Sequence, residues 1–473
     1  MPNDSPSAPS ALGTASIIHQ PSNPARWGAL AVLAGFTLAA LGEPPVGGGG
    51  HDAPQPKPEA PGVAPAFPMP EGLGDDPSVW PNTASYRNSD DWLWRHHDAI
   101  REMRPRVVVL NFANDTDEAK FRGHADAVAA GFAEATRHKG YENPDATPFI
   151  RFQIIKAIDL RDEPAKVEPV RRTSSRMPVK KDLRPGEPAI DYAALFSDEF
   201  APSLGFEDPR TPGRFMNLAE LVNAGWVHEV WFYAIHDAGD PWPGLETCEM
   251  KQFYDDACLP IAGKHGQAGN GQDRSMPWIG RSVRVAFFNP HRGPGCSLEN
   301  YGHTMEWLAN SRSIGYYRDY FYEFADFELD RTHGLPIGSF YRTSYDRRSG
   351  DRIDFPKPDR LELTYRGKKH EAEPFITTGG SAHFPPGARW HYDLDSPYTV
   401  LTTVETYRTR ATPTDADEAR EFSREKFLRY KDVAPDCMGQ WVVYWFQSMP
   451  GLGNAARDRE GRPMKNWWPF LYY

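Results

Sequence analysis

A histidine and a glutamate three residues apart, His303 and Glu306, have the spacing in this chain that best suits metal chemistry. On a helix, side chains three positions apart lie on the same face, although ordinary solvated helix faces carry this pattern too. A neutral imidazole and a carboxylate are common ligands of divalent cations, and zinc is the best match. We predict His383 as the third ligand, with His236 and His391 as alternatives. Three protein ligands leave one position for a water molecule, whose pKa a cation lowers to about 7.

Further polar residues gather where two predicted strands end. One strand is followed by His236 and then by a loop with Glu249, and another ends at Asn289, shortly before Arg292. Ligands of open parallel sheets bind beyond the carboxyl ends of the strands. We therefore predict that His236 or Glu249 acts as a general base or an additional ligand. Asn289 and Arg292 are predicted to orient an oxyanion or a carboxylate of the substrate.

A second interpretation uses Cys296 as a nucleophile in a Cys/His hydrolase. Cys296 follows a predicted strand and precedes a predicted helix, whose N-terminus would lower the pKa of the thiol. His236 follows another strand, and this placement resembles the caspase–clostripain arrangement. The chain has four cysteines, however, and an even number in an exported protein indicates disulfides. Of the possible pairings we expect the short loop Cys248–Cys258.

A third interpretation is glycosidic, because that chemistry needs two carboxylates about 5–10 Å apart. Candidate carboxylates are Glu249, Asp393, Asp395 and Glu405. Aromatic rings that could stack on sugars, although most of them are more typical of a core, are Trp231, Trp242, Trp390, Trp467 and Trp468. A non-catalytic secreted carbohydrate-binding or surface protein is therefore the alternative to an enzyme.

Strands alternating with helices must position these residues. Short, almost wholly apolar runs predict buried strands over residues 106–112, 149–160, 227–235 and 283–289. Helices are predicted from the capping residues Asp115 and Glu118, from Asn217 and Glu220, and over 297–310. This order predicts an α/β fold, with a largely parallel (mixed) sheet and helices on both faces.

The C-terminal part of the chain is rich in aromatic residues and is predicted to form an α+β portion. It contains predicted strands over 361–365 and 398–408, a charged helix over 417–430 and a buried apolar segment over 438–449. We expect a single large globular domain over 85–473, with a core of about 104–325 and a C-terminal portion of about 326–473.

The N-terminal 84 residues have a different composition. A polar leader, 1–25, precedes a signal peptide or membrane anchor, 26–42, and a Pro/Gly-rich linker, 43–84. The uncharged apolar run, Trp27–Gly42, is shorter than the roughly 20 residues that a helix needs to span a bilayer. We therefore expect an exported protein, periplasmic, cell-surface or secreted, that meets a membrane only through this segment.

Charge and motif content exclude several partners. Lys and Arg number 53 against 64 Asp and Glu, and the net charge of −11 provides no field for nucleic acid. No Gly-x-Gly-x-x-Gly or Walker motif follows a predicted strand, so we expect no nucleotide cofactor. The expected partner is an envelope or extracellular peptide or glycan substrate.

Two resemblances accompany these patterns. The segments Gly225–Trp231, Gly302–Glu306, His383–Pro386 and Asn466–Trp468 resemble a set of uncharacterised secreted proteins of bacteria and fungi, over about residues 220–473. That resemblance implies export and a continuous domain, and it carries no activity. The pair His303 and Glu306 with a distant histidine is similar to the pattern of zinc carboxypeptidases, over three residues. Together the patterns predict an exported, metal-dependent hydrolase of an envelope or extracellular polymer, with a peptide, amide or glycan substrate.

Overall fold

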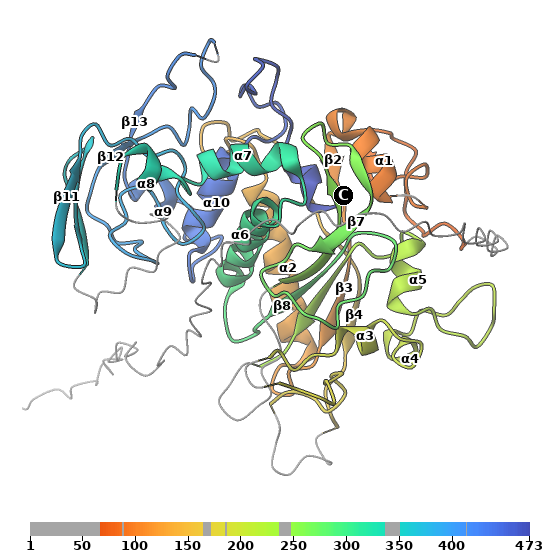
Figure 1. Cartoon of the computed structure of the whole chain (residues 1–473). Helices are drawn as coiled ribbons and strands as arrows, with labels where there is room; N and C mark the ends of the chain where they lie inside the picture. Colours follow the sequence, from red (N-terminus) through yellow and green to blue (C-terminus); the bar gives the residue numbers. More distant parts are fainter. Residues whose placement is uncertain are drawn as a thin grey trace, which may run out of the picture. The chain divides into compact units, whose positions relative to one another are not determined.

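Six strands form the central sheet: β3 (Arg106–Asn111), β4 (Gln153–Asp159), β5 (Glu229–Tyr233), β6 (Thr247–Tyr254), β7 (Pro260–Gln267) and β8 (Val283–Phe288). Their order in the sheet is β4-β3-β5-β8-β6-β7. Figure 1 shows the sheet with β3, β4, β7 and β8 labelled. The first four are parallel to their neighbours, β6 runs antiparallel to β8, and β7 antiparallel to β6. The predicted α/β class with a largely parallel, mixed sheet is confirmed. The hairpin of β6 and β7 had not been predicted.

This computed structural model describes residues 67–87, 89–163, 172–184, 187–235, 247–335, 351–412 and 414–473. The predicted leader, the signal peptide or membrane anchor over 26–42 and most of the linker lie outside these ranges. So do His236 and Trp242. The described residues all fall within one unit of the chain, Val63–Tyr473.

Alternate residues of β3 enter two separate apolar clusters because side chains of a strand point to opposite faces. Val107 and Val109 pack in a cluster with α2 (Glu118–Ala135) and α6 (Pro294–Asn310). Val108 and Leu110 pack in a second cluster with three short helices. These are α3 (Tyr192–Leu195), α4 (Ala201–Leu204) and α5 (Leu218–Asn223). Every residue of β3 is buried as a result.

Helix starts follow capping chemistry, with one correction. Asn217 and Glu220 form both halves of a capping box at α5, as predicted. At α2 the cap is Asp117, whose side chain accepts the Lys120 N–H, so the predicted start at Asp115 is two residues early. Asp115 instead lies 3.0 Å from the imidazole of His291.

Two short strands and two helical segments precede the sheet in the chain. They are β1 (Val79–Trp80), α1 (Ser89–Arg95), the 3-10 turn η2 (His97–Ala99) and β2 (Glu102–Met103). Strands β1 and β2 pair in parallel as a separate two-stranded sheet, and β2 ends three residues before β3 begins.

The C-terminal portion contains small sheets and further helices. The helical elements are α7 (Gly315–Phe324), α8 (Leu329–Thr332), α9 (Glu425–Leu428), α10 (Gly439–Ser448) and the 3-10 turn η5 (Trp468–Leu471). The strands are β9 (Arg352–Lys357), β10 (Arg360–Tyr365), β11 (Lys368–Ala372), β12 (Val400–Thr402) and β13 (Arg420–Phe422). All pair antiparallel, as β9–β10–β11 and β12–β13.

The predicted charged helix over 417–430 is wrong. Residues 420–422 form β13, and only Glu425–Leu428 are helical. Phe422 and Phe427 are both buried, yet residues five apart lie on different sides of a helix, about 140° apart at 3.6 residues per turn. A strand followed by a short helix buries both rings. The strand predicted over 398–408 is also shorter than expected and covers only Val400–Thr402.

Aromatic side chains fill the core of the C-terminal portion, as predicted. All ten residues of α10 are buried, and α10 packs against α2, α6 and α9. Trp441, Trp445, Trp467 and Trp468 are fully buried in the cluster that also covers one face of the sheet. Across the described parts of the chain, no helix is both long enough and apolar enough to cross a membrane.

Candidate metal centre

Helix α6 presents different side chains to its two sides. Tyr301 points toward the sheet, where its hydroxyl donates to Glu229 at the start of β5 (2.6 Å). Glu299 and His303 lie on the opposite side and face the segment around His383. Gly302 permits this approach, because a Cβ there would lie 3.0 Å from the Cβ of Ala382. The glycine therefore lets the segment come close enough for its histidine to reach the helix.

Three donor atoms converge on this side of α6. The Nε2 atom of His383 lies 2.6 Å from Oε1 of Glu299 and 2.8 Å from Nε2 of His303. The Nε2 atom of His303 lies 3.9 Å from the same carboxylate oxygen. One ligand atom from each of Glu299, His303 and His383 thus lies within 4.8 Å of the other two, as a shared cation requires. The side chains are mostly buried, with 6%, 12% and 21% exposure for Glu299, His303 and His383.

The polar contacts around His383 outnumber the protons that neutral side chains could supply for them. His383 Nε2 has three close polar neighbours, Glu299 Oε1, His303 Nε2 and the hydroxyl of Tyr392. A neutral imidazole has one donor and one acceptor nitrogen, so this single atom satisfies at most one of these contacts as a donor. Two imidazole nitrogens that face each other at 2.8 Å also need a proton or a cation between them. A divalent cation in this position would satisfy all three donors at once.

Glu306 holds the ring of His303 from the other side. Its Oε2 atom lies 2.8 Å from Nδ1 of His303, and its Oε1 atom accepts the N–H of Ala382 (3.1 Å). A carboxylate that accepts a hydrogen bond from Nδ1 keeps the proton on that nitrogen, so that Nε2 carries the lone pair with which a histidine binds a metal. Glu306 therefore orients the imidazole and sets its tautomer, and it lies on the side of the ring away from His383.

The electrostatics favour charged carboxylates here. Burial by itself raises the pKa of Glu299, but the hydrogen bond from His383 and the charges of the two histidines outweigh it and leave the pKa below 4.5. Burial opposes ionisation of Glu306 in the same way, and His303 again brings its pKa below 4.5. Both glutamates are thus acceptors at neutral pH.

The structure brings two of the three predicted ligands together. His303 and His383 meet through their Nε2 atoms, whereas Glu306 contacts the opposite nitrogen of His303. The carboxylate beside both Nε2 atoms is that of Glu299, which had not been named as a ligand. The sequence held a signal for it, because Glu299 precedes His303 by four residues and shares its helix face. His391, an alternative ligand, has its ring 5.6 Å from that of His383.

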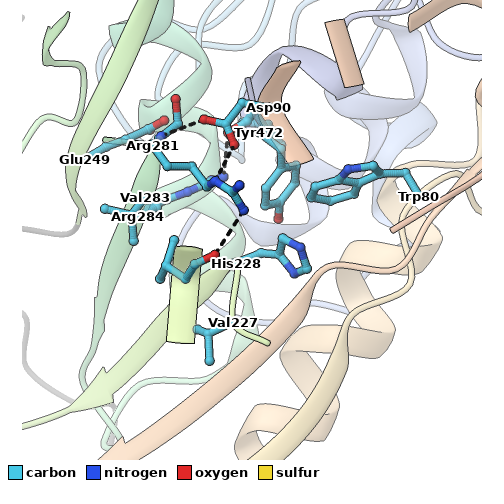
Figure 2. Close-up of a pocket in the computed structure, with 12 residues that line it drawn as sticks. Trp80, Asp90, Val227, His228, Glu249, Arg281, Val283, Arg284 and Tyr472 are labelled. Atoms are coloured by element: carbon cyan, nitrogen blue, oxygen red, sulfur yellow. Dashed lines mark hydrogen bonds and ion pairs between the residues drawn. The ribbon is translucent and has the colours of Figure 1, made fainter. Parts of the chain in front are cut away.

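Glu249, predicted as a general base, belongs to a different environment. It is 1% exposed within β6, and its Oε1 atom lies 3.4 Å from Nζ of Lys251. Figure 2 shows it with Arg284 and Asp90 around a cavity of about 10 Å³, which no residue of α6 lines. That volume holds about one water molecule. The structure therefore does not bring Glu249 to the donor group of Glu299, His303 and His383.

The two residues predicted to orient an oxyanion lie at the start of α6. The side chain of Asn289 accepts the backbone N–H of His291 (3.0 Å), and Arg292 is exposed with Nη1 3.4 Å from the sulfur of Cys296. These bonds of Asn289 and Arg292 are to His291 and Cys296, and neither bond reaches Glu299, His303 or His383.

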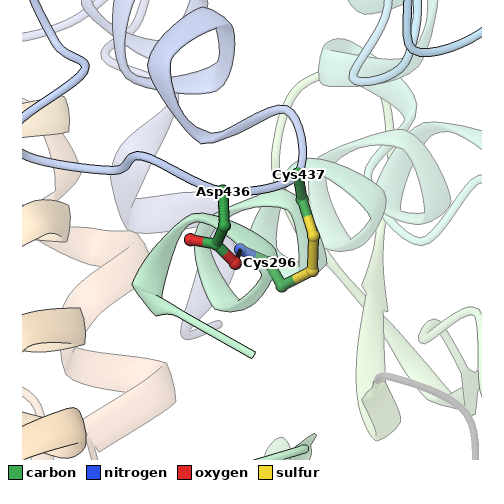
Figure 3. Close-up of side chains that lie close together, drawn as sticks. All are labelled: Cys296, Asp436 and Cys437. Carbon is green, nitrogen blue, oxygen red and sulfur yellow. Dashed lines mark hydrogen bonds between the residues drawn. A yellow bond between two sulfur atoms is a disulfide. The ribbon is translucent and has the colours of Figure 1, made fainter. Parts of the chain in front are cut away.

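The cysteine pairing differs from the prediction. Cys296 and Cys437 form a disulfide, with Cα atoms 5.2 Å apart (Figure 3). Cys248 and Cys258 are free and buried. Cys248 lies near the start of β6, and Cys258 follows its end, so about 20 Å of extended chain separates Cys248 from the last residue of the strand. Cys248 and Cys258 are close in the sequence but do not pair. Cys296 is part of the disulfide and therefore has no thiol to act as the predicted nucleophile.

The turn that carries Cys437 holds the N-terminal half of α6 at three points. The Asp436 carboxylate accepts the N–H groups of Gly293, Gly295 and Cys296, at 2.9, 2.8 and 3.3 Å. Cys437 adds the disulfide, and the N–H of Met438 donates to Oε2 of Glu299 (3.2 Å). We call residues 436–438 the clasp turn. It fixes the second oxygen of Glu299 while the first faces the histidines.

The residues proposed for glycosidic chemistry have separate partners. Asp393 is 3% exposed and pairs with Arg389, Asp395 pairs with Arg424, and Glu405 pairs with Lys426. Of the proposed stacking residues, Trp231, Trp467 and Trp468 are fully buried, so they are unavailable to a sugar. Trp390 is half-buried and lies beneath the guanidinium of Arg389.

Comparison with known proteins does not assign the chain to a family. No protein-family model matches it, and no curated protein matches it.

Proposed function

We propose that the protein is a metal-dependent hydrolase whose divalent cation is held by Glu299, His303 and His383. The observation that carries this proposal is the convergence of one carboxylate oxygen and two Nε2 atoms within 4.8 Å of one another. Two imidazoles and one carboxylate are a donor set of hydrolytic zinc sites, and they leave a position for a further ligand. A cation bound there would act as a Lewis acid and lower the pKa of a water molecule.

The surroundings of the donors support a metal role rather than a chance cluster. Glu306 fixes the tautomer of His303, and the clasp turn fixes one oxygen of Glu299. Metal-binding histidines usually have such an acceptor on the second nitrogen, and removing it typically costs about 10- to 100-fold in affinity. The three donors thus sit in a supported, mostly buried arrangement.

We infer an envelope or extracellular polymer, either a peptide or amide or a glycan, as the substrate. This part of the proposal rests on the apolar segment over residues 26–42, which is typical of an exported protein. The disulfide Cys296–Cys437 supports it, because disulfides persist in oxidising compartments.

A metal titration tests the site. The full-length protein, stripped with a chelator, is titrated with zinc in a calorimeter, alongside E299Q, H303A, H383A and the control H265A. His265 is exposed on the edge strand β7, so its loss leaves binding unchanged. We expect each site variant to bind zinc at least tenfold more weakly than the wild type. Equal affinity in all five proteins would refute the site.

A second measurement tests the reaction class. The stripped and the zinc-loaded protein are compared on dye-labelled protein, peptidoglycan and polysaccharide polymers. We expect hydrolysis of at least one polymer by the loaded wild type, with about a 100-fold or larger loss in H303A, because that variant loses a ligand of the cation that activates the water. A protein that binds zinc tightly but cleaves none of these polymers would contradict the hydrolase assignment and leave the metal site standing.

A further inference from the structure

A fourth oxygen atom stands beside the three donors. The hydroxyl of Tyr392 lies 2.9 Å from Oε1 of Glu299 and 2.9 Å from Nε2 of His383. Both distances are those of hydrogen bonds. Tyr392 lies on a segment outside α6. A cation held by the two imidazoles and the carboxylate would have this oxygen within reach as well, giving two nitrogen and two oxygen donors.

The ring of Tyr392 is placed to move without disturbing the core. The residue is 50% exposed, whereas Glu299 is buried. Its ring packs against the ring of His383, with centroids 4.3 Å apart. A side chain in this position covers the outer side of the donors, and turning it toward solvent uncovers them while breaking few packing contacts.

The backbone beneath Tyr392 is held in an uncommon conformation. Its φ is +64°, in the left-handed region that residues other than glycine rarely adopt. Its N–H donates to the carbonyl of His383 (3.0 Å), and the next residue, Asp393, is buried and bound twice by Arg389. A strained turn that several bonds maintain, with its side chain directed at polar groups, is a common feature of functional sites.

We propose that Tyr392 is a displaceable fourth ligand of the cation, and that its phenolic oxygen covers the coordination position that a substrate oxygen enters. The proposal rests on the metal site proposed above. When the bond from the phenolic oxygen to the cation forms, its proton passes to bulk water. When a substrate oxygen takes the position, that bond breaks and the oxygen regains a proton from water.

The absorption spectrum of the copper-loaded protein tests this ligand directly. A phenolate bound to Cu²⁺ gives a visible charge-transfer band, which imidazole and carboxylate ligands do not give. We expect the band in the full-length wild type and its loss in Y392F, together with at least a tenfold weaker zinc affinity, since even outer residues of metal sites are worth about 10-fold. The control Y365F changes a half-buried tyrosine of β10 and keeps the band.

A second variant and a competitor complete the test. Y392N removes the phenol with a residue that tolerates a positive φ, so its loss of the band would not reflect a strained backbone. Acetohydroxamate, a small bidentate oxygen ligand, is expected to remove the band from the wild type as it binds. A band that survives saturation with acetohydroxamate would show that the tyrosine is not displaced.

The outcomes separate this proposal from the one on which it rests. Wild type and Y392F with the same zinc affinity and the same spectrum would overturn the role of Tyr392 and leave the three-residue site intact. Absence of copper and zinc binding in the wild type would overturn both. Wild-type binding with a band that Y392F and Y392N lose supports both.

Discussion

Two buried clusters of ionisable groups lie on opposite sides of helix α6, and they balance charge differently. On the sheet side, Glu229 lies 3.8 Å from Arg284, and Glu249 lies 3.4 Å from Lys251, so each carboxylate has a cation from the chain. On the other side, the described partners of Glu299 are two imidazoles, a phenol and a backbone N–H. No lysine or arginine is among them.

This difference supports the proposed cation beside Glu299, His303 and His383. A buried carboxylate is costly unless an opposite charge or several hydrogen bonds compensate it. The sheet-side cluster supplies this charge internally. The cluster around Glu299 has donors without a permanent positive charge, and this suits the cation proposed for it. Four variants test whether the two clusters differ in this way.

The largest effect is expected from R284M on the sheet side. It leaves Glu229, which is 0% exposed, buried without its cation, and breaking a buried ion pair costs about 3–5 kcal/mol. Urea unfolding measures the loss, and zinc affinity measured on the folded fraction stays unchanged. R331M, at the ion pair with Glu328 whose side chains are 75% and 45% exposed, is the control and changes stability by about 0.5 kcal/mol or less. A loss in R284M no larger than the control would show that the pair is not structural.

The next effect comes from breaking the disulfide with C296S/C437S. The bond closes a chain segment of 141 residues, and such cross-links typically contribute about 2–4 kcal/mol to the free energy of unfolding. We also expect weaker zinc binding, because the clasp turn fixes Glu299. A dithiol reductant lowers wild-type stability and leaves the double variant unchanged. Unaltered zinc affinity in the double variant would separate the clasp turn from the metal centre.

A smaller effect is expected from E306Q. Glu306 orients His303 without sharing its Nε2, so the substitution weakens zinc binding by about 10- to 100-fold and leaves the spectrum of the cobalt-loaded protein unchanged. E299Q alters both the affinity and the spectrum. If E306Q instead changes the spectrum as E299Q does, Glu306 is a direct ligand, as the helical spacing had first indicated.

The smallest effect is a pH dependence on the sheet side. His228 is buried beside Arg106, and burial brings its pKa well below 6.5. Below pH 6.5 the unfolded chain binds a proton that the folded protein does not. The free energy of unfolding therefore decreases as the pH is lowered, by up to about 1.4 kcal/mol per pH unit for this group. H228Q reduces this slope between pH 6.5 and 5 in urea unfolding. E299Q leaves it unchanged, and an equal slope in H228Q would assign the dependence elsewhere.

Periodicity predicted the elements that carry these clusters. The apolar runs gave the four parallel strands, and the spacing of His303 and Glu306 identified the polar face of α6. Helical spacing alone cannot choose between Glu299 and Glu306, because one lies four residues before His303 and the other three after it. The choice depends on which ring nitrogen each carboxylate meets, and that follows from the packing of His383.

The remaining features depend on contacts between distant segments. Tyr392 lies in a turn with a positive φ, outside any repeating pattern, so its sequence gives no sign of its place beside His383. The pairing of Cys296 with Cys437 follows from the way the turn before α10 meets α6. Cys248 and Cys258 do not form a disulfide, because the extended strand β6, which had not been predicted, runs between them.

Helix α10 has a consequence for the order in which the protein forms. It comes about 300 residues after α2, yet the two pack together over the same face of the sheet. During synthesis α2 therefore stays without this partner until about 300 further residues have been made. Such distant pairings slow folding, because a long chain must close before they form.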